Sequence, residues 1–289
     1  DDTVINKIAA GEVVERPASV IKELVENAID AQATNIKIEL EDGGKKLITI
    51  QDDGCGVGYN DLKLILKRHA TSKITTLGEL FSVHSMGFRG EALSSISAVS
   101  RFTLLSKQPE NSTGHKLTFE NSKKEEITTW HGANGTYIRI EDIFYNVPVR
   151  KKFLRSSQAE YSHCLETLQA LALAYPKHSF SLKHNGKIKF DAQSNIQGDN
   201  HWLRGNEYIL GEPTIQQRAS QIFGKELAGN LLYVCETNEY GSIEALISPP
   251  GIEKATTKNM FFFVNGRWIK EQILRYGFLR GYHSHLLKG

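Results

Sequence analysis

One stretch near the start of the chain constrains the fold most strongly, because its side chains separate into an apolar and a polar half on a helix. Val, Ile, Leu and Ala recur there at helical spacing, and Pro17 fits the first turn. Glu23 and Asn27 lie four residues apart, so a carboxylate and an amide project side by side. The pattern predicts an amphipathic helix through residues 22–31, with Ser19 assisting its cap. A solvated polar face is the alternative to a site.

The chain is long enough for two domains, since it has 289 residues. Residues from about 192 to 213 are polar and contain glycine, which is typical of a linker. We therefore expect one domain over residues 1–200 and a smaller one over residues 201–289.

Composition excludes several classes of protein. No apolar run approaches the roughly 18 residues of a membrane span, so we expect no membrane association. The three cysteines are odd in number and form no C-x-x-C pair, which argues against a disulfide framework or a zinc site and favours a reducing cytoplasm. A net charge of +2 does not by itself indicate nucleic acid, but Lys and Arg are concentrated after residue 253.

A predicted β-hairpin follows the helix and leads into a loop rich in glycine. Residues 35–40 and 47–51 alternate between apolar and polar, with Asp-Gly-Gly between them. The second strand runs directly into Asp52. Three glycines then stand at alternate positions, where backbone without side chains can approach a flat ligand closely, although a generous turn is the simpler alternative. They are Gly54, Gly56 and Gly58.

Two later segments are suited to anions. One loop offers two hydroxyl groups and a cation, and another is bracketed by glycines and opens a helix, so its backbone N–H groups converge. The first segment contains Thr71, Ser72 and Lys73, and the second contains Gly87, Phe88, Arg89, Gly90, Glu91, Ala92 and Leu93.

The remaining patterns predict an α+β fold. Helices are expected at residues 60–69, 161–175 and 215–227 and from residue 271, and strands at 102–106, 116–120, 136–142, 180–184, 187–190, 231–236, 241–248 and 260–264. Residues 109–114 and 121–126 are expected to be polar and to belong to a mobile hairpin.

Neither a P-loop nor a dinucleotide-binding fingerprint occurs in the sequence. The functional interpretation therefore depends on the order of these segments along the chain. On that order, and on residues 8–17 and 144–146, the chain resembles the N-terminal ATPase region of the bacterial MutL family of DNA mismatch repair proteins, within the GHKL ATPase superfamily. The resemblance implies a GHKL-type α/β sandwich followed by a smaller, truncated domain like ribosomal protein S5.

The resemblance also implies roles for residues, with ATP and Mg²⁺ as cofactors. Glu23 falls on the general base that activates water, Asn27 on the Mg²⁺ ligand and Asp52 on the carboxylate that reads adenine. The lid around the triphosphate falls on residues 71–73 and 87–93. Further nucleotide contacts fall on Ala31, Gly54, Gly56, Val57, Gly58 and Thr136. We expect Glu26, Asp53 and His69 to have no such role, with Glu26 facing solvent.

The implied function is slow ATP hydrolysis that orders the lid and drives homodimerisation through this region, which gates partner binding in the cytoplasm near the nucleoid. The implied partners are DNA, contacted without sequence specificity through Arg267, the mismatch-recognition protein MutS, and a downstream repair nuclease or helicase. A strand of the family whose lysine reaches the γ-phosphate does not occur in this chain, so hydrolysis by this chain stays open. The alternatives are a type II topoisomerase ATPase subunit and a DNA-binding scaffold that does not turn nucleotide over.

Overall fold

The computed structural model of the chain describes residues 14–65, 92–120, 124–194, 211–252 and 256–282. Its contacts divide it into two compact units. The first comprises residues 1–168 and 178–191, and the second comprises residues 169–177 and 192–289. The expected domain break at residue 200 lies outside the described residues.

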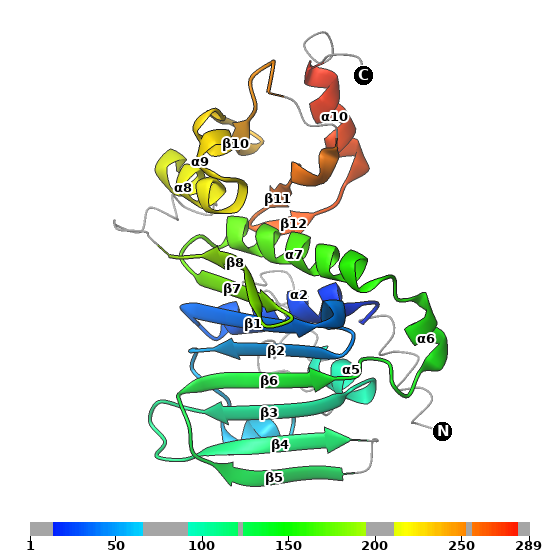
Figure 1. The fold of residues 1–289 in the computed structure, drawn as a ribbon. Coiled ribbons are helices and arrows are strands. Elements are labelled where there is room, and N and C mark those ends of the chain that lie inside the picture. Colours follow the sequence, from blue (N-terminus) through cyan, green and yellow to red (C-terminus); the bar gives the residue numbers. More distant parts are fainter. Residues whose placement is uncertain (1–13, 66–91, 121–123, 195–210, 253–255, 283–289) are drawn as a thin grey trace. The chain divides into compact units, whose positions relative to one another are not determined.

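A single eight-stranded sheet forms the frame of the first unit, in the order β5-β4-β3-β6-β2-β1-β7-β8 (Figure 1). β1 and β7 are parallel, whereas β1–β2, β2–β6, β6–β3, β3–β4 and β4–β5 are antiparallel. The strands are β1 (Asn35–Glu41), β2 (Leu47–Asp52), β3 (Arg101–Lys107), β4 (Gly114–Glu120), β5 (Lys124–Trp130), β6 (Gly135–Glu141), β7 (Ser179–His184) and β8 (Lys187–Ala192).

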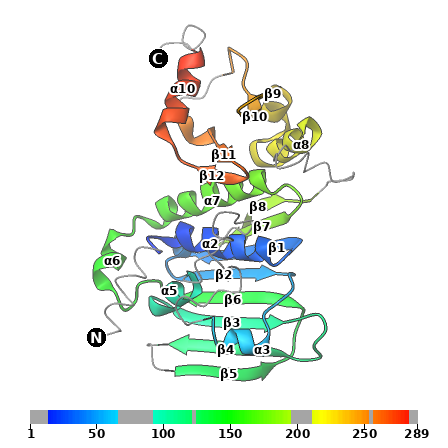
Figure 2. The same cartoon turned by 180° about the vertical axis from the view of Figure 1, so that it is seen from behind.

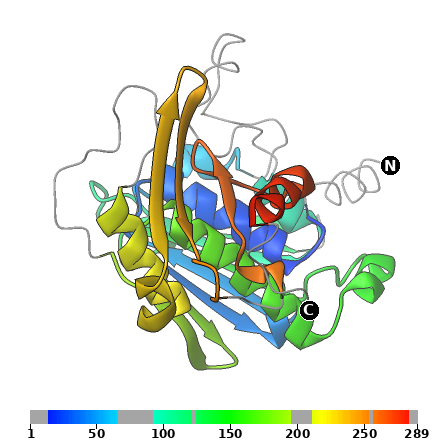
Figure 3. The same ribbon diagram turned by 90° about the horizontal axis from the view of Figure 1, so that it is seen from above.

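Helices cover one face of this sheet, where α2 packs against β2 and α5 against β3 (Figures 2 and 3). The apolar half of α2 and the inward residues of the central strands are buried, and each fully buried Leu or Ile contributes about 1.5–3 kcal/mol of transfer free energy. The helices are α2 (Pro17–Asp30), α3 (Tyr59–Leu62), α5 (Ala92–Ala98), α6 (Pro148–Phe153), α7 (Ser157–Ala174) and the 3₁₀ turn η1 (Asp42–Gly44).

The start of α2 confirms part of its prediction and corrects another part. Pro17 occupies the first turn and Arg16 is extended, with φ −158°. No side chain caps the helix, so the expected cap by Ser19 is wrong. The backbone N–H of Ser19 instead donates to the Arg16 carbonyl at 3.0 Å. A backbone turn therefore begins the helix without side-chain help.

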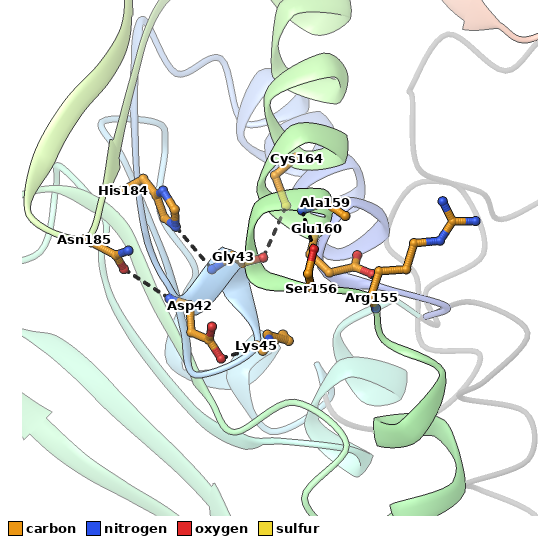
Figure 4. Close-up of polar contacts among 10 residues, drawn as sticks. All are labelled: Asp42, Gly43, Lys45, Arg155, Ser156, Ala159, Glu160, Cys164, His184 and Asn185. Atoms are coloured by element: carbon orange, nitrogen blue, oxygen red, sulfur yellow. Dashed lines mark hydrogen bonds and ion pairs between the residues drawn. The ribbon is translucent and has the colours of Figure 1, made fainter.

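The turn between β1 and β2 is held from both sides by residues far along the chain (Figure 4). The Gly43 N–H donates to Nε2 of His184 at 3.2 Å, and the Cys164 thiol lies 3.8 Å from the Gly43 carbonyl. The Asp42 N–H donates to Oδ1 of Asn185 at 3.1 Å. A Cβ on Gly43 would lie 2.3 Å from the Ser157 carbonyl oxygen, so this position requires glycine. The hairpin turn thus packs against both α7 and the β7–β8 hairpin.

The second unit contains short helices and two hairpins, of which β9–β10 is the longer (Figure 3). The helix expected over residues 215–227 is interrupted at Gly224, whose φ of +90° is incompatible with a continuous helix. No helix among the described residues combines the length and apolarity that a membrane crossing requires. The elements are α8 (Glu212–Phe223), α9 (Lys225–Gly229), β9 (Leu232–Asn238), β10 (Gly241–Ile247), η2 (Thr257–Asn259), β11 (Phe262–Val264), β12 (Arg267–Ile269) and α10 (Gln272–Tyr282).

Two strands differ from the expectation. The polar segment expected over residues 121–126 contains the start of β5, which was not predicted as a strand and which pairs with β4. β12 was also not predicted, and it pairs with β11 across the Asn265-Gly266 turn. The described part of the segment expected to be helical at residues 60–69 forms only α3 and a following turn.

Candidate functional site

The C-terminal end of α2 connects that helix to the glycine loop. Gln32 adopts a positive φ of 60°, the Gln32 N–H donates to the Ile29 carbonyl at 2.9 Å, and the Ala33 N–H donates to the Ala28 carbonyl at 3.0 Å. These bonds form a Schellman motif. The Ala31 carbonyl then accepts the Cys55 N–H at 2.9 Å. The end of the helix is thereby fixed against residues 52–58.

Asp52 ends β2 inside the protein, with 9% of its surface exposed. Its Oδ1 accepts the Gly54 N–H at 2.9 Å, and its carboxyl group also accepts the backbone N–H of Thr136. Burial raises the pKa of Asp52 to about 6 despite these hydrogen bonds. Asp53, in contrast, accepts both the N–H and the hydroxyl of Thr34 at 2.7 Å. Asp52 is therefore the buried carboxyl group of this loop, whereas Asp53 joins the loop to the start of β1.

The glycine loop packs closely against protein backbone at two of its glycines. A Cβ on Gly56, whose φ is +70°, would lie 2.4 Å from the Lys107 carbonyl oxygen. A Cβ on Gly54 would lie 2.7 Å from the Ala31 carbonyl oxygen. At these two positions the absent side chain makes room for the chain itself, so the glycines position the loop.

Sequence reasoning missed Ser106, the last inward residue of β3. Its side chain is fully buried, and its Oγ contacts three partners. It accepts the Val57 N–H at 2.8 Å, donates to the Gly135 carbonyl at 2.9 Å and lies 3.1 Å from Oγ1 of Thr136. The alternation of buried residues along β3 could have indicated that this serine faces inward.

The polar half of α2 is not uniformly exposed. The Glu23 side chain is 31% exposed and lies 3.5 Å from Nζ of Lys22. Asn27, one helical turn later, is half-buried. Glu26 is 5% exposed and bonded to Lys22 at 2.9 Å, so the expectation that it faces solvent is wrong. Burial raises the pKa of Glu26. Glu23 and Asn27 remain the accessible carboxylate and amide of this face.

A cavity of about 240 Å³ lies at the ends of β2, β3 and β6. Its lining includes Gln51, Leu105 and Tyr137, which stand opposite one another in the strand register. These side chains face the other side of the sheet from Ser106, because successive residues of a strand point to opposite faces. Within the described ranges, no group of three or more His, Cys, Asp or Glu is placed to hold a metal ion. The cavity is lined by Gln51, Asp52, Leu105, Trp130, Ala133, Asn134, Gly135, Thr136 and Tyr137.

The structure brings together only part of the predicted site. Ala31, Asp52, Gly54, Val57 and Thr136 join through the contacts above. Gly58 begins α3 as its cap, and Ala92 and Leu93 begin α5, which packs on α2. Other predicted residues lie outside the described ranges, namely Thr71, Ser72, Lys73, Gly87, Phe88, Arg89, Gly90 and Glu91.

Arg267 belongs to the second unit, where it is exposed at the start of β12. Asn265 and Gly266 have φ values of 48° and 75°, as in a type I′ turn, and Val264 pairs with Arg267 across it. The tight turn therefore presents the guanidinium at the end of a hairpin.

Comparison with known proteins agrees with this geometry. Residues 15–147 match the family described as histidine kinase-, DNA gyrase B- and HSP90-like ATPase, and residues 219–289 match the DNA mismatch repair protein, C-terminal domain. DNA mismatch repair protein MutL of Syntrophotalea carbinolica is 39% identical over 100% of this chain, and MutL of Geobacter sulfurreducens is 38% identical over 100%. The chain belongs to the MutL family. It corresponds to 43% and 45% of those two MutL proteins, so it spans less than half of their length.

Solved structures confirm the GHKL-type α+β fold. The Aquifex aeolicus MutL ATPase domain complexed with ADP superimposes with a TM-score of 0.70 and is 25% identical, covering 93% of this chain and 88% of that one. The N-terminal domain of a DNA repair protein gives a TM-score of 0.78 at 23% identity, covering 97% and 82%, and shows the shared fold alone. The MutL relatives match over 100% of this chain and therefore over both units, which favours the MutL family over the topoisomerase alternative.

The described residues fit a purine nucleotide. A buried carboxyl group with a raised pKa, held by two backbone N–H groups, can accept hydrogen bonds from a base amine. The amide of Asn27 is a hard oxygen donor of the kind that Mg²⁺ takes together with phosphates and water. The arrangement can therefore bind a base at one end of α2 and serve phosphate chemistry along its polar face.

Proposed function

We propose that this chain binds ATP with Mg²⁺ and hydrolyses it slowly as part of a mismatch repair protein. The observation that carries the proposal is the Asp52 carboxyl group, which is buried, held by two backbone N–H groups and joined through the glycine loop to α2. ATPase membership of the family and the ADP in the Aquifex structure support it. Asp52 reads the base, and α2 carries the groups that act on phosphate.

Glu23 and Asn27 divide the chemistry on α2. The carboxylate of Glu23, which is partly exposed, orients the attacking water and accepts its proton. The amide oxygen of Asn27 would hold Mg²⁺, which supplies charge neutralisation on the phosphates. Glu26 takes no part, because it is buried against Lys22.

Replacing Glu23 tests this division. Glu23→Ala abolishes ATP turnover by the chain and leaves the Kd for ATP within about twofold, because the base acts only on water. Glu126→Ala, an exposed glutamate on β5, serves as the control and keeps full turnover. Equal turnover in Glu23→Ala and the unmodified chain would refute the assignment.

The same proposal includes a conformational cycle and partners. ATP orders the segments around residues 71–73 and 87–93 and drives homodimerisation of this region, which gates binding of DNA, MutS and a downstream nuclease or helicase in the bacterial cytoplasm. Exposed Arg267 at a tight hairpin, with Lys270 and Arg275 on the same unit, supports contact with DNA phosphates that does not depend on base sequence. Size-exclusion chromatography with a non-hydrolysable ATP analogue tests dimerisation, and a monomer under saturating analogue would contradict it.

A further inference from the structure

Ser106 occupies a place in the site that none of the expected roles explains. In the strand register it stands opposite Thr136, which in turn stands opposite Asp52. The three residues form one row across β3, β6 and β2. Ser106 is the member farthest from the base-reading carboxylate and is fully buried, so it acts on a ligand only through its neighbours.

The hydrogen bonds of Ser106 fix the direction of both hydroxyl protons in this row. A hydroxyl group has one proton to donate and two lone pairs that accept. The Val57 N–H can only donate and the Gly135 carbonyl can only accept, so the Ser106 proton points to Gly135. The remaining contact, 3.1 Å between Ser106 Oγ and Thr136 Oγ1, must then be donated by Thr136.

As a result, Thr136 and Asp52 can only accept hydrogen bonds from a bound ligand. The single hydroxyl proton of Thr136 is committed to Ser106, so Thr136 Oγ1 can only accept. The ionised Asp52 carboxylate can also only accept. A base edge that meets both groups gains hydrogen bonds if it carries an amine, whereas a base with a carbonyl at that position sets acceptor against acceptor.

We propose that Ser106 is a positioning residue that determines base specificity, because it holds the Thr136 hydroxyl as an acceptor and fixes the glycine loop through Val57. The site thereby selects 6-amino purine nucleotides over 6-oxo purine nucleotides. This inference rests on the proposed nucleotide-binding function.

The test compares the Kd values of ADP and IDP, which differ in the group at position 6 of the base, at about pH 8, where Asp52 is ionised. Wild type prefers ADP. The selectivity is the Kd for IDP divided by the Kd for ADP. Ser106→Ala frees the Thr136 proton and lowers this ratio by about tenfold. Ser106→Cys, whose thiol forms only weak hydrogen bonds, lowers the ratio less. An unchanged ratio in folded Ser106→Ala or Ser106→Cys would overturn the inference.

Ser100→Ala is the matched control. Ser100 is equally buried and donates to a backbone carbonyl, that of Ile96, at 2.7 Å. This variant loses a similar buried hydroxyl and keeps the wild-type Kd ratio, and an equal fall of the ratio in it would show a merely structural effect and overturn the assignment.

A double-mutant cycle separates this inference from the proposed function. Thr136→Val lowers the ratio by itself, and in that background Ser106→Ala leaves the ratio unchanged if Ser106 acts through Thr136. A further tenfold fall would overturn the mechanism. If wild type binds neither nucleotide, the proposed function fails and the inference with it, whereas ADP binding with an unchanged ratio in Ser106→Ala rejects the role of Ser106 alone.

Discussion

Thr136 lies directly opposite Asp52 in the register of β2 and β6, and its backbone N–H donates to the buried Asp52 carboxyl group. Burial raises the pKa of Asp52 to about 6, an effect that outweighs the hydrogen bonds from Gly54 and Thr136, which favour the ionised form. The group that we propose to read the base therefore changes its charge close to neutral pH.

ADP affinity is expected to rise with pH up to about 6 and then to level off. Below that pH the ligand-free protein holds a proton on Asp52, and binding a base amine must expel it, which costs about tenfold in Kd per pH unit. Isothermal titration calorimetry from about pH 5 to pH 8 measures the profile. Asp52→Asn should bind more weakly and lose the slope, and a slope that persists in Asp52→Asn would assign it to the phosphates.

The same carboxyl group is expected to have the opposite effect on the stability of the ligand-free protein. Its folded pKa of about 6 lies above the usual aspartate pKa of about 3.9, so the folded state binds the proton more tightly. Stability is then highest below about pH 4 with respect to this group, and about 3 kcal/mol is lost as the pH rises to about 6. Urea unfolding of wild type and Asp52→Asn measures the difference, which should disappear in the variant.

The neighbouring glutamates on α2 are expected to separate stability from catalysis. Glu26→Ala removes a buried side chain and the hydrogen-bonded partner of Lys22, so it should cost about 1–2 kcal/mol, limited because Lys22 is 42% exposed and can be solvated. ATP turnover should persist. Glu23→Ala should abolish ATP turnover and leave the free energy of unfolding nearly unchanged. Urea midpoints and phosphate release measure both, and loss of turnover in a folded Glu26→Ala variant would contradict the division.

Two glycines with similar backbone conformations are expected to respond very differently to alanine. Gly186, with φ of +76°, has open space around a Cβ, so Gly186→Ala should cost only about 1–2 kcal/mol for the left-handed conformation. At Gly56, with φ of +70°, an alanine Cβ would also force the Lys107 carbonyl to move. Gly56→Ala should therefore cost about 2 kcal/mol more and weaken ADP binding. Equal losses of stability in the two variants, measured by thermal unfolding, would show that the loop around Gly56 relaxes freely.

Arg267→Glu is expected to weaken DNA binding and to flatten its dependence on salt. Each phosphate contact contributes about one unit to the slope of log K against log salt, so the slope should fall by about one. Lys225→Glu makes a charge reversal of the same size on exposed α9 and should change the slope less. Fluorescence anisotropy with a duplex at several salt concentrations measures both. Identical slopes would leave Arg267 as a solvated side chain.

Sequence periodicity predicted the frame of the first unit because its central elements bury regular faces. The helix around Glu23 carries its apolar side chains at helical spacing, and β1 alternates between exposed and buried residues. The Asn185-Gly186 turn has a specific backbone requirement. β5 escaped prediction because it is an edge strand. It is polar along most of its length, and Ile127 is the one aliphatic side chain it sets opposite Leu117.

The site was less predictable because its hydrogen bonds connect distant segments. Ser106 contacts Val57 and Gly135, which lie 49 and 29 residues away along the chain, and no local pattern encodes such contacts. The burial of Glu26 was hidden for a related reason, since the protein covers more of α2 than its apolar half. The sequence indicated the glycines of the loop as special positions, but only the fold reveals that Gly56 accommodates the Lys107 carbonyl.

The clamp around Gly43 has a consequence for the order of folding. β1 and β2 are adjacent in the chain and can pair early, yet the turn between them is completed by His184, 141 residues later than Gly43. Such distant contacts slow folding, because a long loop must close before they contribute. On the ribosome, the hairpin at the centre of the sheet emerges early and is among the last parts to be secured.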